Sequence, residues 1–374
     1  MLHESMLGPY IAKNREIGYI GGKNTPTFKN VVGILPPKEL SKRHFSIRKD
    51  APLWAAKIRI WDSVFKATNG FMEENRVLLF DLPITTRMIS SPGALTGTIL
   101  SDVDPFEIDF FNKKTFLTQS SQLYLEFAIT NPEIDKVYCW EKSFRMEPAD
   151  FRHLPEFTHV EFEGNIGFKD NLIIQRKYLQ YLIRYIIHNN KSDLEMFIGE
   201  EDINELDKFT NMEDIKSITF HKAFKLLKDE TGNSKYDKPT ISTFGAYEEI
   251  LLTQIMQSPV FVTNYISDEV AFYHANDETD KNLVKNADLL FPGYGELIGG
   301  GERVYTRKEA GEKAKHFELD MKDYRPYIES RDKKNPNIHS GWGMGIERFI
   351  QSILRLPFIW DAKVFPRVNG ESHL

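Results

Sequence analysis

Apolar and polar residues alternate in two runs of the sequence, 144–147 and 158–163. This period of two predicts two strands, each with one apolar and one charged face. The stretch between them holds turn formers and cations, namely Asp150, Arg152, His153 and Pro155, so a β-hairpin is expected. Its Arg145 and Glu147, beside an Arg-His loop, suit an anionic ligand with hydrogen-bond donors, such as a nucleoside triphosphate. A salt-bridged sheet face without a ligand is the alternative.

A second pattern covers residues 339–354. Three alternate glycines (Gly341, Gly343, Gly345) in a strand-like run indicate that the backbone closely approaches another group. A helix is expected next, because apolar residues follow its period: Ile346, Phe349, Ile350, Ile353 and Leu354. Arg348 lies in the first turn, roughly opposite this apolar face. A cation there is unfavourable by about 0.3–1 kcal/mol, so Arg348 is expected to have an anionic partner.

The same periodicities predict the remaining elements. Helices are expected over residues 53–68, 171–188 and 220–227, and over the segment that holds Glu248 and Glu249. Strands are expected over 77–80, 260–265 and 271–273, with short ones at 19–20 and 31–35. The basic segment 40–50 is predicted to be a solvated linker. This mixture indicates an α+β protein, with an N-terminal extension over residues 1–52 and one large domain over 53–374.

Composition narrows the class of protein. The net charge of −6 gives no overall basic field of the kind that gathers nucleic acid, so no DNA partner is expected. The single cysteine, Cys139, excludes an intramolecular disulfide and a cysteine-based zinc site, and its apolar surroundings predict a buried thiol. No apolar run approaches 18 residues, and the N-terminus lacks a signal-peptide pattern. The sequence therefore predicts a soluble, cytoplasmic protein without membrane contact.

The hairpin FRMEPADFRHLPEF (144–157) and the stretch GWGMGIER (341–348) resemble motifs 2 and 3 of the class II aminoacyl-tRNA synthetases, in their aspartate/asparagine subgroup. Residues 117–126 resemble the subgroup's amino-acid pocket, and residues 288–303 its metal-binding strand pair. Residues 53–83 resemble motif 1, through which these enzymes form homodimers. The resemblance implies the class II catalytic fold over 53–374, an antiparallel sheet flanked by helices. Residues 1–52 lack the pattern of a complete five-stranded anticodon-binding barrel.

Candidate site residues follow from both lines of reasoning. The uncharged side chains of Gln119, Ser120 and Gln122 suit an amino acid's ammonium and carboxylate. The resemblance adds Glu126 and Arg303 to this amino-acid site, although a strand-end ion pair is an equal alternative for Arg303. It also implies an ATP-binding set, in which Arg145 and Arg348 are catalytic: Arg145, Glu147, Arg152, His153, Phe157, Glu296 and Arg348. Glu296, with Asp288 as a second ligand, would hold Mg²⁺. Relatives often have a serine where this chain has Gly299.

Position 125 bears on the substrate. Aspartate-specific relatives have a lysine there, whereas Leu125 followed by Glu126 resembles the asparagine-type pattern. An aspartate side chain would then need another buried cation, for which Arg331, Lys333 and Lys334 are candidates. The Ser- and Gly-rich stretch 88–98 is expected to be a flap near this site or a plain surface loop.

The implied chemistry is adenylation of aspartate or asparagine by ATP. In the first hypothesis, aspartyl adenylate reacts with ammonia to give asparagine, AMP and pyrophosphate; we favour it because stand-alone relatives without the barrel carry it out. In the second, asparagine is transferred to tRNA or another carrier, which the Leu125-Glu126 pattern supports. The third is a silent regulatory paralogue, although a silent site has no reason to retain its charged residues.

Overall fold

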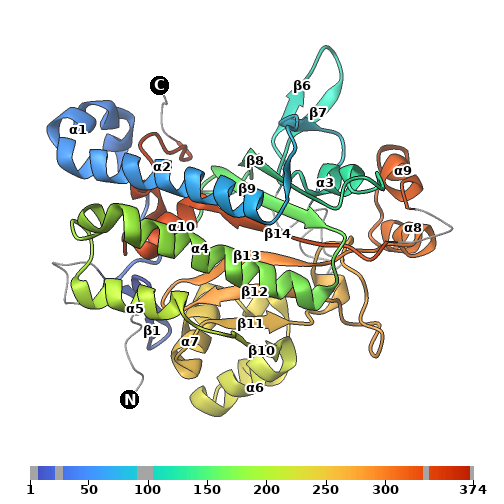
Figure 1. Ribbon diagram of the computed structural model, residues 1–374. Coiled ribbons are helices and arrows are strands. Elements are labelled where there is room, and N and C mark those ends of the chain that lie inside the picture. Colours follow the sequence, from blue (N-terminus) through green and yellow to red (C-terminus); the bar gives the residue numbers. More distant parts are fainter. Residues whose placement is uncertain (1–6, 22–27, 91–103, 332–336, 371–374) are drawn as a thin grey trace.

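An eight-stranded sheet runs through the molecule (Figure 1). The computed structural model describes residues 7–21, 28–90, 104–331 and 337–370. In spatial order the strands are β10 (Lys216–Thr219), β11 (Val260–Thr263), β12 (Asn286–Phe291), β13 (Gly295–Glu302), β14 (Ser340–Gly345), β9 (Glu156–Gly164), β8 (Lys136–Phe144) and β4 (Leu78–Leu79). Neighbours are antiparallel except for the two outermost pairs, β10/β11 and β4/β8. The expected α+β class and the antiparallel sheet are confirmed.

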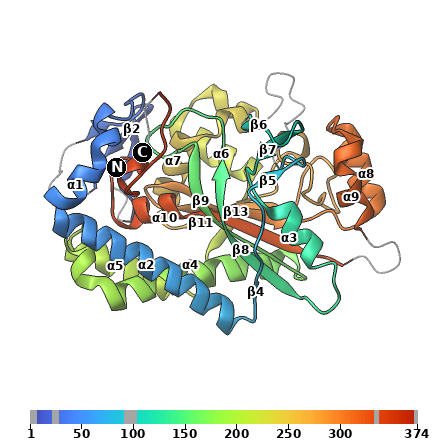
Figure 2. The same ribbon diagram turned by 90° about the horizontal axis from the view of Figure 1, so that it is seen from above.

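Two long helices, α2 (Ala51–Glu74) and α4 (Phe168–Leu194), lie side by side across one face of this sheet (Figures 1 and 2). They include the helices predicted over 53–68 and 171–188. The apolar face of the hairpin points toward them, because alternate residues of a strand face opposite sides. Phe162 stacks on Trp342 of the neighbouring strand with ring centroids 5.6 Å apart. The ring centroid of Tyr178 on α4 lies 4.7 Å from that of Trp342. This packing is the centre of the main hydrophobic core.

The opposite face of the central strands carries the charged residues. His159, Glu161 and Glu163 of β9 are paired in register with Gly345, Gly343 and Gly341 of β14. A Cβ at Gly341 would lie 2.0 Å from the Glu163 carboxylate, and one at Gly343 would lie 2.6 Å from His159 Nε2. Glycine is therefore needed at both positions because charged side chains of the adjacent strand occupy the space. This is the close approach that the alternate glycines predicted.

The other elements surround the sheet. A three-stranded sheet contains β5 (Thr85–Thr86), β7 (Lys114–Leu117) and β6 (Glu107–Asp109), in that order. A second contains β1 (Tyr10–Lys13), β2 (Glu16–Tyr19) and β3 (Lys29–Asn30). The remaining helices are α1 (Arg43–Lys49), α3 (Gln122–Ala128), α5 (Glu200–Thr210), α6 (Phe220–Thr231), α7 (Ala246–Met256), α8 (Arg307–His316), α9 (Met321–Glu329) and α10 (Ile346–Ile353). Among the described residues, none of the helices is both long and apolar enough to cross a membrane.

Three predictions for local structure were wrong. Residues 31–35 are not a strand, because Gly33 has a φ of +79° that an extended strand does not contain. The segment 40–50 is not a linker, because it contains α1, whose Arg43 is held by Asp361 at 2.8 Å. Residues 271–273 form a turn, in which Phe272 is fully buried against the aromatic residues of α9. Most of the loop 88–98 lies outside the described residues.

Candidate active site

Two adjoining cavities of 70 and 290 Å³ open on the charged face of the sheet. They share four lining residues, Arg145, His159, Glu296 and Gly343. The smaller cavity is lined by the whole predicted ATP-binding set: Arg145, Glu147, Arg152, His153, Phe157, Glu296 and Arg348. These residues come from the hairpin, β13 and α10, so the fold brings together positions that are up to 203 residues apart (145 to 348).

The β8–β9 loop supplies one wall of the smaller cavity. Strand β8 ends at Phe144, so Arg145 and Glu147 lie just beyond the strand and not within it as the alternation predicted. Arg145 N–H still donates to Pro155 O at 2.9 Å, which closes the loop. The guanidinium carbon of Arg145 lies 5.3 Å from the centre of the Phe157 ring. The wall thus combines a cation, a carboxylate and an aromatic face.

Helix α10 supplies the opposite wall. Arg348 has the anionic partner expected for a cation in the first turn, because its Nη1 lies 3.1 Å from Glu296 Oε2. The adjacent Glu347 is fully buried, accepts the Thr158 N–H at 2.8 Å and forms an ion pair with Lys363, whose Nζ lies 3.1 Å away. Glu347 therefore fixes the start of α10 to β9, and Arg348 is held at the cavity.

Arg152 is buried and already paired. Its guanidinium makes two hydrogen bonds to Glu249 of α7, at 2.6 and 3.2 Å. The same Glu249 accepts the backbone N–H of Glu296 at 2.9 Å. Burial alone would raise the pKa of Glu249, but the charge and hydrogen bonds of Arg152 outweigh it and lower that pKa. Arg152 is thus held rigidly, with much of its charge compensated.

Two carboxylates are suited to hold a metal ion. Asp288 on β12 and Glu296 on β13 lie on either side of Gly299, where a Cβ would be 3.2 Å from Asp288 Oδ1 and 2.9 Å from Glu296 Oε1. The missing side chain lets both carboxylates approach the same space. Burial and the repulsion from Glu296 raise the pKa of Asp288 well above its usual range. A hard divalent cation such as Mg²⁺ would relieve this repulsion, so the pair fits the ion that the sequence implied.

The larger cavity is lined by Ser120, Gln122 and Arg303 of the predicted amino-acid site, and by Asp288. Glu161 also lines it and is at the centre of a polar cluster: it accepts the Ser121 N–H at 2.8 Å and a short hydrogen bond from the Ser120 hydroxyl. The Ser121 N–H also donates to Glu141 Oε1 at 3.0 Å. One donor is therefore shared by two buried carboxylates.

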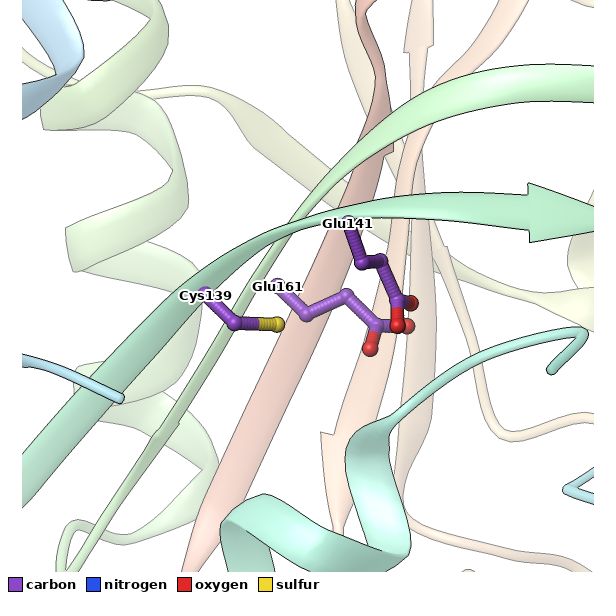
Figure 3. Close-up of side chains that lie close together, drawn as sticks. All are labelled: Cys139, Glu141 and Glu161. Atoms are coloured by element: carbon purple, nitrogen blue, oxygen red, sulfur yellow. The ribbon is translucent and has the colours of Figure 1, made fainter. Parts of the chain in front are cut away.

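Cys139, Glu141 and Glu161 project from β8 and β9 toward one another (Figure 3). One ligand-type atom of each lies within 4.8 Å of the others. Burial and the negative charge of Glu141 raise the pKa of Glu161 well above its usual range, because two carboxylates this close cannot both ionise easily. Cys139 is buried, as its apolar surroundings predicted, and burial raises the pKa of its thiol, which disfavours the reactive thiolate.

Two buried ion pairs lie beside the larger cavity: one contains Arg303, which lines it, and the other lies behind its lining residue Gln122. Arg303 donates from Nε and Nη2 to Glu163 at 3.2 and 3.1 Å. Arg331 is paired with Glu126, which also accepts from Tyr327 at 3.1 Å and lies 3.0 Å from His339 Nε2. Arg331 was one of the candidate cations; Lys333 and Lys334 lie outside the described residues.

Glu126 and Gln119 do not line either cavity. Both are buried, and Glu126 is fully enclosed by its partners. Its link to the cavity is Gln122, whose Nε2 donates to Glu126 Oε1 at 2.6 Å. Glu126 therefore orients Gln122 and does not itself face the cavity. The buried charge at this position is compensated by Arg331, which is why no ligand is needed to neutralise it.

Several lining residues were missed in the sequence. His159 and Glu161 belong to the charged face of β9, so the period-two pattern that predicted the strand could have identified them. Tyr273 and His274 also line the larger cavity, but they lie in the turn that was predicted as a strand. Glu249 was placed on the correct helix without a role, since nothing local to it signals a contact with Arg152.

The pH dependence of stability tests the Glu126 cluster. Burial would raise the pKa of Glu126, but Arg331 and His339 lower it to about 2, below the usual 4.5 of a glutamate. The ionised form is therefore stabilising above pH 4.5, and this contribution is lost as the pH falls toward 2. We expect Glu126→Gln to remove a pH-dependent part of roughly 3 kcal/mol from the free energy of unfolding, measured by denaturant titrations between pH 5 and 2.5. The control Glu312→Gln changes an exposed carboxylate; curves for Glu126→Gln that run parallel to wild type would contradict the assignment.

Comparisons with known proteins agree with this geometry. Residues 37–369 match the family of class II tRNA synthetases (D, K and N). The chain is 33% identical to the asparagine–tRNA ligase of Pelotomaculum thermopropionicum over 330 residues, 87% of this chain and 72% of that protein. It is also 33% identical to the asparagine–tRNA ligase of Pyrococcus furiosus over 336 residues, 89% of this chain and 72% of that protein.

The structural comparison gives the same answer. The asparaginyl-tRNA synthetase of Pyrococcus horikoshii, complexed with asparaginyl-adenylate, superposes with a TM-score of 0.80 and 25% identity over 96% of this chain and 83% of that one. The family's reaction begins with ATP-dependent adenylation of an amino acid, and its members are ligases. This chain belongs to the class II tRNA synthetases of the D, K and N group.

Proposed function

We propose that this protein activates asparagine with ATP, forming asparaginyl adenylate and pyrophosphate. One observation carries the choice of amino acid: Arg303, which lines the larger cavity, and Arg331, which lies behind its lining residue Gln122, are each paired with a buried glutamate. A neutral amide fits such compensated charges, whereas a carboxylate would need an unpaired cation. The names of the curated relatives support the same substrate.

The adenylation step asks the protein to position groups and neutralise charge, with little covalent chemistry of its own. Arg145 lines both cavities, so it can contact the amino-acid carboxylate and the α-phosphate together. Glu147 would accept from the adenine amine and Phe157 would stack on the base. Arg348 would cap the other face of the base or bind the γ-phosphate. Arg152 and His153 would contact the leaving pyrophosphate.

Glu296 and Asp288 would hold Mg²⁺, which neutralises phosphate charge when it is bound. At the other end, Ser120, Gln122 and Glu161 would bind the substrate ammonium. Burial and Glu141 raise the pKa of Glu161, which favours the protonated carboxyl in the free enzyme. An ammonium group next to Glu161 favours its ionised form, so binding of the amino acid would release this proton.

Transfer to tRNA, as the relatives' names suggest, is the proposed second step. The alternative is amidation of aspartyl adenylate by ammonia, and two observations favour it. Burial and Glu126 raise the pKa of Glu163 to about 7, although Arg303 opposes them. When Glu163 is protonated, Arg303 keeps an uncompensated charge that suits a carboxylate. Among the described residues before 37, only a three-stranded sheet is present, and a barrel needs five strands.

We also propose a homodimer that forms at strand β4. This strand is the last of the eight-stranded sheet, and its Leu78 and Leu79 are 55% and 62% exposed. Phe65 of α2 is half exposed beside it and packs on Trp140 of β8, with ring centroids 5.1 Å apart. An exposed apolar edge strand is unfavourable in a monomer. A second copy of the same surface would cover it.

Substrate use tests the proposed function. Purified protein with ATP and Mg²⁺ is expected to catalyse ATP–pyrophosphate exchange with asparagine and to release AMP when total tRNA is added. Aspartate with ammonia is the comparison, and free asparagine is measured in each mixture. Free asparagine formed only from aspartate and ammonia would replace the proposal with the amidation reaction. The absence of ATP–pyrophosphate exchange with either amino acid would contradict both the proposed function and the amidation reaction.

Removal of either catalytic arginine tests the site. Arg145→Ala and Arg348→Ala are each expected to lower the exchange rate by at least about 100-fold, the usual cost of losing a group that neutralises transition-state charge. Circular dichroism should stay unchanged. Arg307→Ala, which removes an exposed ion pair with Glu329, is the matched control. Normal turnover in either site variant would contradict the assignment.

A charge on β4 tests the dimer. Leu79→Arg places a cation in the proposed apolar interface and is expected to shift the protein from dimer to monomer in sedimentation equilibrium. Leu35→Arg makes the same change at a residue that is 75% exposed elsewhere and should leave the mass unchanged. A wild-type monomer, or a Leu79→Arg dimer of unchanged affinity, would refute the interface.

A further inference from the structure

The segment of residues 7–21 lies before the stretch that matches the family, which begins at residue 37, yet its side chains enter the main core. Tyr10 of β1 is fully buried, and its hydroxyl donates to Pro357 O at 2.8 Å. A phenylalanine would fill the same space without needing a polar partner. The buried hydroxyl of Tyr10 therefore needs hydrogen-bond partners, and these partners connect Tyr10 to the residues that line the smaller cavity.

Tyr10 contacts the β8–β9 loop on one side. Its ring meets the edge of the Phe151 ring, with centroids 5.2 Å apart and planes at 88°. Phe151 directly precedes Arg152, and Phe151 O accepts the Ile359 N–H at 3.0 Å. The backbone that carries Arg152 is thus held between Tyr10 and the segment that contains Ile359, which itself lines the cavity.

On its other side Tyr10 contacts the turn before β13. Its N–H donates to Gly293 O at 2.8 Å, and its ring centroid lies 5.9 Å from that of Tyr294. The two chains are so close that a Cβ at Gly8 would lie 2.5 Å from the Gly293 backbone. Glu296 follows Tyr294 by two residues, so this contact positions the carboxylate that pairs with Arg348.

Gln351 joins the two sides. Its Oε1 accepts the Tyr294 hydroxyl at 2.6 Å, and its Nε2 donates to the Tyr10 hydroxyl at 2.6 Å and to Phe151 O at 2.8 Å. Gln351 lies on α10, one turn after Arg348. Every member of this network is buried, and a fully bonded buried network specifies one arrangement of the segments that it joins.

We propose that Tyr10 is a positioning residue for the nucleotide end of the site. Through Phe151, Tyr294 and Gln351 it sets the relative placement of Arg152, Glu296 and Arg348, although it touches none of them. The inference rests on the proposed function only in assuming that this end binds ATP. A shift of the three groups by a fraction of an ångström would weaken contacts with the triphosphate and leave the amino-acid cavity unaffected.

The matched pair Tyr10→Phe and Tyr19→Phe tests this. Tyr19 lies on the neighbouring strand and donates its hydroxyl to Arg355 O at 3.0 Å, near the end of α10. Each variant loses one buried tyrosine hydroxyl from the same small sheet. In ATP–pyrophosphate exchange we expect Tyr10→Phe to lower kcat/KM for ATP by about tenfold, as misplaced catalytic groups do, with KM for asparagine unchanged. Tyr19→Phe should match wild type in both.

Hydrogen exchange gives a readout that does not need activity. Peptides covering 150–154 and 292–297 should exchange faster in Tyr10→Phe than in Tyr19→Phe, with β10 and β11 unchanged in both. Gln351→Met cuts the network from the helix side and should reproduce the Tyr10→Phe effects, with a double variant that is no worse than either. Equal effects of the two tyrosine variants, or losses that follow thermal stability alone, would overturn the proposal.

Failure of the proposed function and failure of the proposed role of Tyr10 can be told apart. If wild-type protein shows no exchange reaction with any amino acid, the proposed function fails. The hydrogen-exchange comparison then still decides the role of Tyr10: faster exchange confined to the two peptides supports it, and no difference between the variants overturns it.

Discussion

The need to compensate charges on a buried sheet face organises this molecule. The central hairpin places His159, Glu161 and Glu163 on the face opposite the hydrophobic core, where little water reaches them. Burial of a lone charge costs several kcal/mol, roughly the whole stability of a domain. Each charge therefore has a partner or a raised pKa, and the glycines of β14 leave room for these side chains. The charged side chains that are not fully compensated face the two cavities.

This constraint explains how the two ends of the site differ. In the smaller cavity, the proposed nucleotide end, Arg145, Arg348 and Glu296 retain partial exposure and line open space, so under the proposed function a triphosphate and its metal would replace their present partners. At the larger cavity, Arg303 is paired with Glu163, and Arg331 is paired with Glu126 behind Gln122. A ligand there meets hydrogen-bonding groups with little net charge. Under the proposed function, the choice between amide and carboxylate depends on how far Glu163 compensates Arg303, and burial raises the pKa of Glu163 to about 7.

Local pattern was enough to predict the parts of the site that local sequence positions. The period of two identified the hairpin, the period of 3.6 identified α2, α4 and α10, and the electrostatics of a helix start predicted a partner for Arg348. The pairs that set the charge balance could not be found this way. Arg152 and Glu249 are 97 residues apart, and Arg331 and Glu126 are 205 apart. Only the tertiary fold brings these loop and helix residues together.

The hydrogen bond between Tyr10 and Gln351 joins residues that are still farther apart in the sequence, and it bears on how the chain is organised. Tyr10 and Gln351 are separated by 341 residues, and Tyr10 lies before residue 37, where the match to the family model begins. Several residues of the nucleotide end lie in the β8–β9 loop or at the ends of a strand and a helix, where few bonds hold them at fixed distances. Under our proposal, a buried hydroxyl that links three of these segments supplies this rigidity from residues before the match to the family model. The N-terminal residues are therefore better regarded as part of the catalytic unit than as an appendage to it.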